Sequence, residues 1–166
     1  DHPDGRARRA LQMTCQYLPR AYDNGAGDPV AREKMGNAAT MAGMAFANAF
    51  LGVCHSMAHK LGAFHHLPHG VANALLICHV LRFNAAVKEA AAKYGQLARL
   101  CGLAPNPRAL AAGWNRLRSQ LKLPDRLAAC GVETKQLHAA LDELTAAALG
   151  DLCAPANPRS APAEDV

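Results

Sequence analysis

A chain of 166 residues that is 51% apolar can bury one hydrophobic core, but it is too short for two large domains. The chain has a net charge of +5, and its basic residues are unevenly distributed, because nine of the 18 lie between Arg82 and Arg126. Side chains that could stack on bases are sparse there, so we expect solvated helix faces rather than a nucleic-acid surface. We find no signal peptide, and the apolar residues 40–53 are too few to span a bilayer, which predicts a cytoplasmic protein with no membrane partner.

The first third of the sequence predicts two helices joined by a loop. Residues 6–17 read as a short helix that we expect to end before Pro19. The loop that follows is rich in turn-forming residues, and Asp28 can cap a second helix whose first residue is Pro29. We expect this helix to run as far as about Phe50 and to be buried.

Residues 35–81 are unusual because their only charged side chain is that of Lys60, while six of the eight histidines lie among them. A helical segment without a polar face is buried or faces another domain. Buried imidazoles need hydrogen-bond partners or a metal. This segment is therefore where we expect the chemistry of the protein.

Four more helices are predicted along the rest of the chain, over residues 69–83, 85–100, 107–121 and 134–149. Gly102 and Gly150 are suited to end two of them. A proline-rich coil follows at the C-terminal end. The sequence shows no strand-like alternation, no β-α-β pattern and no internal repeat, which predicts an all-α helical bundle.

The six cysteines are widely spaced and include no Cys-x-x-Cys pair. This spacing argues against a zinc finger and against a small scaffold held together by disulfides. Reduced thiols are the usual state in the cytosol, so we expect free cysteines.

A histidine constellation carries the functional signal. His55 and His59 are four residues apart and share one face of a helix. His69 follows Pro68 at the start of the next predicted helix, so a helical hairpin can bring it beside His55. Neutral imidazole is a common ligand of zinc, iron, nickel and copper. On spacing alone, a metal site and a set of packed histidines are about equally supported. The metalloprotease pattern H-E-x-x-H is absent.

These histidines belong to a longer motif. The sequence reads Gly-x-x-His-x-x-Ala-His-x-x-Gly, then five residues, then Pro-His-Gly, with fixed positions at Gly52, His55, Ala58, His59, Gly62, Pro68, His69 and Gly70. This motif resembles the signature of the iron-containing alcohol dehydrogenases. The flanking residues 30–35, 42–52, 71–76 and 156–159 resemble the same family, especially the alcohol dehydrogenase domain of bifunctional acetaldehyde–alcohol dehydrogenases.

The resemblance implies a fold, a set of roles and a set of partners. The fold would be the helical C-terminal domain of the dehydroquinate synthase-like architecture. His55 and His69 would be metal ligands, and His59 would be a non-ligand that contacts the nicotinamide or moves protons; its structural alternative is a histidine bonded to a backbone carbonyl. The metal would be Fe²⁺, with Zn²⁺ as an alternative, the cofactor NAD and the substrate a short alcohol or aldehyde. The parent enzyme would be a homo-oligomer.

The family pattern is incomplete in this sequence. The Asp-x-x-x-His pair that supplies the family's other two ligands is absent, as is the glycine-rich loop of its nucleotide-binding domain. We therefore expect residues 1–166 to be one truncated helical metal-binding domain, without its N-terminal α/β domain and with little or no activity alone.

Two alternatives remain open. A stand-alone helical metal-binding or oligomerisation module would need a complete ligand set, to which His65, His66 or Cys54 could contribute. A nucleic-acid-binding protein would instead use the basic residues between Arg82 and Arg126. Within the dehydrogenase interpretation, we expect His65 and His66 to be exposed and His79 to pack.

Overall fold

The computed structural model describes residues 2–166, and in this range the chain is helical without β-strands. The all-α prediction is confirmed. Seven α-helices are joined by short loops: α1 (His2–Asn24), α2 (Pro29–Ala49), α3 (Val53–His65), α4 (His69–Asn84), α5 (Lys88–Leu100), α6 (Pro107–Gln120) and α7 (Thr134–Leu149). Three short 3₁₀ helices lie in the C-terminal part: η1 (Leu127–Cys130), η2 (Ala154–Ala156) and η3 (Ala163–Asp165).

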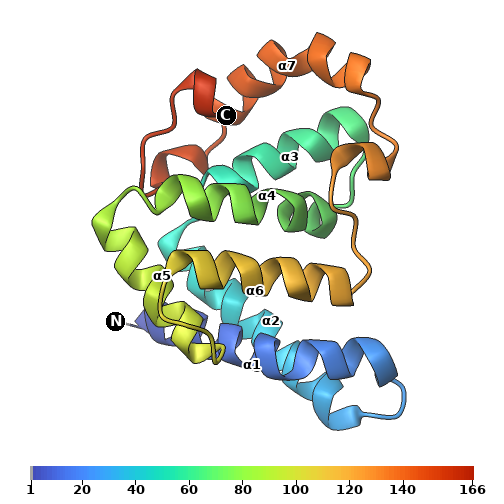
Figure 1. The fold of residues 1–166 in the computed structure, drawn as a ribbon, viewed down its shortest axis with the longest axis vertical. Helices are drawn as coiled ribbons and strands as arrows, with labels where there is room; N and C mark the ends of the chain where they lie inside the picture. Colours follow the sequence, from blue (N-terminus) through green and yellow to red (C-terminus); the bar gives the residue numbers. More distant parts are fainter. Residues whose placement is uncertain (1) are drawn as a thin grey trace.

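The helices stack from one end of the molecule to the other (Figure 1). An α1–α2 hairpin forms one end, α6 lies between it and α4, and α3 pairs with α4. At the other end α7 covers α3, and the C-terminal segment returns beside the start of α3 through η2. The α3–α4 hairpin, which carries the histidine motif, therefore lies at the centre of the contacts.

The first helix is longer than the sequence predicts. α1 continues through Pro19, where we expected it to end, and stops at Asn24. Proline in a helix removes one backbone hydrogen bond and costs about 3 kcal/mol. Packing of α1 against α2 offsets this local cost. Arg20 adds a bidentate contact, because its Nε and Nη2 lie 2.9 and 2.8 Å from Asp28 Oδ2.

The second helix begins as predicted but is not buried. Asp28 accepts a hydrogen bond from the Ala31 N–H at 2.9 Å, and Pro29 is the first helical residue. Phe46 and Phe50, however, are 46% and 72% exposed. Among the described residues α2 packs mainly on α1, so only one of its faces is covered. No single helix of residues 2–166 is long and apolar enough to cross a membrane; α2 and α3 meet that test only together, with a 107° bend between them.

The core consists of three clusters around α3 and α4. One joins these two helices to Val132 near α7, through Ala58, Leu61 and Leu75. Another joins α4 to α5 and α6 through Cys78, Leu81, Ala98 and Leu110. A third joins the start of α3 to the C-terminal segment, around Val53 and Val80. These clusters hold the α3–α4 hairpin on several sides and so position the histidines.

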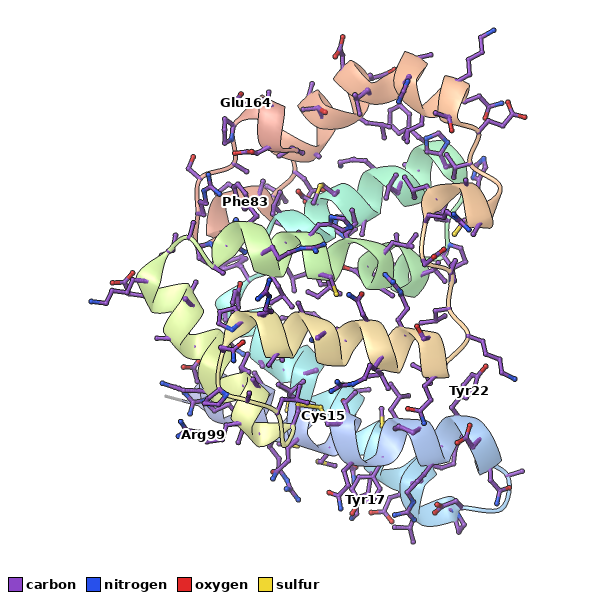
Figure 2. All side chains as sticks on the ribbon, in the orientation of Figure 1. Cys15, Tyr17, Tyr22, Phe83, Arg99 and Glu164 are labelled. Atoms are coloured by element: carbon purple, nitrogen blue, oxygen red, sulfur yellow. A yellow bond between two sulfur atoms is a disulfide. The ribbon has the colours of Figure 1, made fainter. Side chains whose placement is uncertain are left out.

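A disulfide links α1 to the loop that follows α5. Cys15 on α1 is bonded to Cys101 just after α5, with a Cα–Cα distance of 5.8 Å (Figure 2). Our expectation of reduced thiols is therefore wrong for these two residues, and it is confirmed for Cys54, Cys78, Cys130 and Cys153. Sequence spacing could not indicate the pair, because 86 residues separate its members.

Candidate metal centre

Three histidines of the motif meet where α3 runs beside α4. His55 and His59 lie one turn apart on α3, and His69 is the first residue of α4. The ring centroids of His55 and His69 are 5.3 Å apart, those of His59 and His69 are 5.3 Å apart, and those of His55 and His59 are 6.3 Å apart. His59 and His69 are exposed and His55 is half-buried, so the cluster opens to solvent on one side.

The local sequence explains the hairpin that brings them together. α3 ends at His65, and the next residue, His66, adopts the left-handed backbone conformation with φ of 55°. Pro68 then precedes α4 in an extended conformation, which a proline favours. At the other end of α3, a Cβ on Gly52 would lie 2.8 Å from Asn157 Oδ1 and would push this side chain from its hydrogen bonds to Val53 and Asn84. Both ends of the metal-motif helix are thus defined by motif residues or their immediate neighbours.

The pair His55 and His69 has the chemistry and spacing of two ligands of one ion. Burial lowers the pKa of His55, and the nearby His69 and His59 act in the same direction, so its ring is neutral and has a free lone pair at pH 7. Two imidazoles that bind one ion at about 2.1 Å place their ring centroids about 5 Å apart, as observed for this pair. Their rings are tilted by 50°, which allows the in-plane lone pairs to converge. By contrast, His59 and His69 are stacked at 19°, and lone pairs in parallel planes do not converge.

His69 is oriented by a short hydrogen-bonded chain. Asn73 Nδ2 lies 3.1 Å from His69 Nε2 and donates a second hydrogen bond to the His69 carbonyl at 3.1 Å. The Cys54 thiol donates to Asn73 Oδ1 at 3.4 Å, which fixes the orientation of the amide. Burial raises the pKa of Cys54 to about 12, so this thiol stays protonated. An ion bound through His69 Nε2 would replace one hydrogen bond and leave the amide satisfied by the carbonyl.

His59 has a partner that the sequence did not reveal. Its Nδ1 lies 3.1 Å from Asp151 Oδ2, a carboxylate partner rather than the backbone carbonyl of the structural alternative. Lys60 also contacts Asp151 Oδ2, with its Nζ at 2.9 Å, so the single charge of the apolar section is paired rather than solvated. Asp151 follows the predicted end of α7 at Gly150 and lies 92 residues from His59. Nothing in its local sequence pointed to this contact.

The remaining histidines of residues 35–81 lie outside the cluster. His66 is exposed as expected, whereas His65 is half-buried and its Nε2 is buried without a hydrogen-bond partner. His79 is exposed rather than packed, and its Nδ1 lies 3.5 Å from Arg82 Nη2. None of the three therefore converges with His55 and His69 in the part of the chain that the structure describes.

The C-terminal segment locks the start of α3 through two asparagines. Asn157 and the buried Asn84 exchange side-chain hydrogen bonds at 3.1 and 2.8 Å, and Asn157 Oδ1 also accepts from the Val53 N–H at 3.4 Å. We expect Asn157→Ala to destabilise the fold by about 2–4 kcal/mol, because the Asn84 amide would be left buried and unpaired. Urea unfolding measures this loss.

A double-mutant cycle separates this lock from general effects of substitution. Asn84→Ala combined with Asn157→Ala should cost less than the sum of the single changes, because neither partner is then left unpaired. Asn37→Ala on the exposed side of α2 is the matched control and should change the free energy of unfolding by less than about 0.5 kcal/mol. Additive single effects would contradict the lock.

Comparisons with known proteins identify the family of this chain. Over residues 1–166 the chain matches the family model described as Fe-containing alcohol dehydrogenase family, C-terminal. The chain belongs to the iron-containing alcohol dehydrogenase family. The resemblance of the motif and of the fold to this family is thus confirmed.

Relatives and solved structures of the iron-containing alcohol dehydrogenase family match this chain over nearly its whole length. The chain is 44% identical over 176 residues to the bifunctional aldehyde-alcohol dehydrogenase AdhE of Escherichia coli, and 42% identical over 174 residues to the 1-propanol dehydrogenase PduQ of Salmonella typhimurium. These matches cover 94% and 100% of this chain. Over 98% of its length the chain superposes on the iron-containing alcohol dehydrogenase of Thermococcus thioreducens with a TM-score of 0.89 and 31% sequence identity. Its superposition on a 1,3-propanediol oxidoreductase has a TM-score of 0.88 at 34% sequence identity.

The chain spans less than half the length of these relatives. It covers 20% of the E. coli protein, 46% of the Salmonella protein and 41% of the Thermococcus structure.

Proposed function

We propose that this chain is the helical, metal-binding half of an NAD-dependent alcohol dehydrogenase that interconverts short primary alcohols and aldehydes. The observation that carries the proposal is the convergence of His55 and His69 at a ring separation of 5.3 Å within the family motif. We assign these two residues as ligands of Fe²⁺, with Zn²⁺ as the alternative that the same donors would accept. The 1-propanol and aldehyde–alcohol activities named for the relatives support a short-chain substrate.

In this proposal the chain orients and binds, while its cofactors supply the redox chemistry. When bound, the metal polarises the alcohol or carbonyl oxygen as a Lewis acid, and NAD provides the hydride acceptor. His55 and His69 would hold the metal on the side of the cluster that is open to solvent. His59 lies beside both ligands and is suited to exchange the hydroxyl proton with solvent, because its ring is exposed.

The site needs partners that the described residues do not supply. Two imidazoles leave most positions of a metal open, and a hydride transfer needs water excluded from the reacting atoms. We propose that an α/β nucleotide-binding domain supplies the NAD site, the remaining ligands and this cover. A homo-oligomeric parent enzyme and a cytoplasmic location are further parts of the proposal. The cytosol usually keeps cysteines reduced, so a cytoplasmic location requires that the Cys15–Cys101 disulfide resist reduction there.

A stand-alone metal-binding module is the second candidate, and the structure disfavours it. That module required additional ligands from Cys54, His65 or His66. The Cys54 thiol is buried and donates to Asn73 Oδ1, and His65 and His66 do not join the cluster. Titration with Fe²⁺ or Zn²⁺ separates the two candidates. The dehydrogenase half should bind weakly by itself, whereas tight binding of one ion per chain would favour the module.

We expect the isolated chain to oxidise ethanol or 1-propanol with NAD⁺ at no detectable rate, even with Fe²⁺ or Zn²⁺ added. The reason is the absence, among its residues, of a complete ligand set and of a dinucleotide fold. Absorbance of NADH measures the turnover, with the E. coli relative as a positive control. Measurable turnover by the chain alone would contradict the proposed division of labour.

The coding sequence upstream of Asp1 provides the complementary test. An Asp-x-x-x-His helix and a glycine-rich α/β domain there would support the proposal directly. A start codon at that position would mean that the chain shares ancestry with the dehydrogenases but not their function.

A further inference from the structure

The carboxylate of Asp151 contacts three groups. His59 Nδ1 is 3.1 Å and Lys60 Nζ is 2.9 Å from its Oδ2, while the backbone N–H of Cys153 donates to its Oδ1 at 3.0 Å. The Asp151 side chain is only 11% exposed. It reaches α3 from the segment after α7, so the contact joins two distant parts of the chain.

These contacts determine the ionisation state of Asp151. Burial opposes the charged form, but the hydrogen bonds from Lys60, from the Cys153 backbone and from His59 together hold the pKa of Asp151 well below its usual range. An ionised carboxylate can only accept hydrogen bonds. At a distance of 3.1 Å, the proton between the two side chains must therefore reside on His59 Nδ1.

We propose that Asp151 is a positioning residue that fixes His59 as its Nδ1–H tautomer, and that Lys60 holds Asp151 in place for this task. The lone pair of His59 is then on Nε2, the ring nitrogen that faces away from Asp151. The consequence for catalysis rests on the proposed function: His59 would accept the hydroxyl proton at Nε2 without a change of tautomer or ring orientation.

The packing of His59 supports a fixed ring. Its ring stacks on His69 at 5.3 Å and 19°, and it lies edge-on to His55 at 6.3 Å. These contacts define the plane of the ring but not which nitrogen carries the proton. A rotation of the ring by 180° would remove Nδ1 from Asp151 and lose a charge-assisted hydrogen bond. The Asp151 carboxylate therefore determines which ring nitrogen of His59 carries the proton, which stacking alone does not.

A metal ion bound between His59, Asp151 and Cys153 would be a different use of the same residues, because their potential ligand atoms lie within 4.8 Å of one another. Two observations argue against it. The Lys60 ammonium already occupies Asp151 Oδ2. Asp151 Oδ1 accepts a hydrogen bond from the Cys153 backbone N–H, so both carboxylate oxygens already have partners.

The tautomer of His59 can be read directly in the chain labelled with ¹⁵N-histidine. In a spectrum recorded at about pH 9, a neutral imidazole ring shows one protonated and one unprotonated nitrogen. We expect the protonated shift at Nδ1 of His59, with the resonances assigned by their loss in His59→Gln. A protonated Nε2, or an average of the two tautomers, in the unmodified chain would overturn the proposal without any variant.

Asp151→Asn tests the cause. The backbone N–H of Cys153 is fixed and should keep the amide oxygen at the Oδ1 position, whereas the flexible Lys60 ammonium can move away. The Asn amide group would then replace Oδ2, donate to His59 Nδ1 and move the ring proton to Nε2. Asp142→Asn, an exposed carboxylate on α7, makes the same charge change away from His59 and should leave the tautomer unaltered. Lys60→Met should release Asp151 and yield a mixture of tautomers. Circular dichroism checks that each variant is folded, and an unchanged tautomer in a folded Asp151→Asn chain would refute the assignment.

Kinetics of the enzyme that contains this chain test the consequence. Asp151→Asn should lower kcat by about 10²–10⁴-fold, the usual contribution of general acid–base catalysis, with a much smaller change in KM. An unchanged kcat alongside an inverted tautomer would overturn the catalytic part of the proposal. Absence of dehydrogenase activity in the unmodified protein would instead refute the proposed function and leave the tautomer assignment intact.

Discussion

Replacing His69 with alanine in the enzyme that contains this chain should remove most of its bound metal and, with it, most of its alcohol dehydrogenase activity. His69 is the only proposed ligand on α4, and its ring lies 5.3 Å from that of His55. Loss of groups that merely support a metal ligand reduces affinity by about 10–100-fold, so loss of the ligand itself should cost at least about 100-fold. Elemental analysis of the purified protein measures the metal content.

The control for this experiment is His138→Ala. His138 is exposed on α7, and we find no contact of its side chain with the cluster. This variant should keep both metal and activity. A His69→Ala protein with unchanged metal content would refute the assignment of His69 as a ligand. Activity lost with metal retained would refute it as well, because it would mean that His69 acts without binding the ion.

Removing the Cys15–Cys101 disulfide should lower the melting temperature of the chain by about 10–15 °C. The bond closes a loop with a sequence separation of 86 residues, and the chain-entropy relation gives about 4–5 kcal/mol for a loop of this length. For a domain of this size, 1 kcal/mol changes the melting temperature by about 2–4 °C. Because α1 and α2 contribute little to the three core clusters, the bond is a principal attachment of this hairpin.

Thermal unfolding of Cys15→Ser/Cys101→Ser with and without dithiothreitol measures the effect. Dithiothreitol should lower the melting temperature of the unmodified chain to that of the double variant and leave the variant unchanged. Cys130→Ser, which removes a free thiol, is the control. Alkylation in denaturant without reductant should modify four cysteines. Modification of all six would contradict the disulfide.

Local chemistry made most helix boundaries predictable. Asp28 and Pro29 define the start of α2 because a side-chain cap and a proline act within one turn. Thr134–Leu149 was predicted to the residue, since the helical pattern ends at Gly150. Pro19 led to a wrong prediction of where α1 ends. Its local cost of about 3 kcal/mol is exceeded by the packing of α1 against α2, whose position cannot be predicted from the residues around Pro19.

The residues of the candidate site also fall into those that local sequence predicts and those that it does not. Its two proposed ligands and His59 belong to one continuous motif of 19 residues, whose spacing on a helical hairpin is enough to bring the rings together. Asn157 and Asp151 reach the same hairpin from about 70 to 100 positions away. Contacts of this kind leave no periodic pattern in a single sequence, because only the path of the chain through the bundle places the two partners side by side.

The sequence by itself determined the helical class, the family motif and the residues able to bind a metal, since each depends on spacing within one or two helical turns. Only the tertiary structure decided that Cys15 meets Cys101, that α2 leaves Phe46 and Phe50 exposed, and that Asp151 partners both His59 and Lys60. Those features arise from packing between segments distant in the sequence. Their free energies outweigh local preferences only after the bundle has formed.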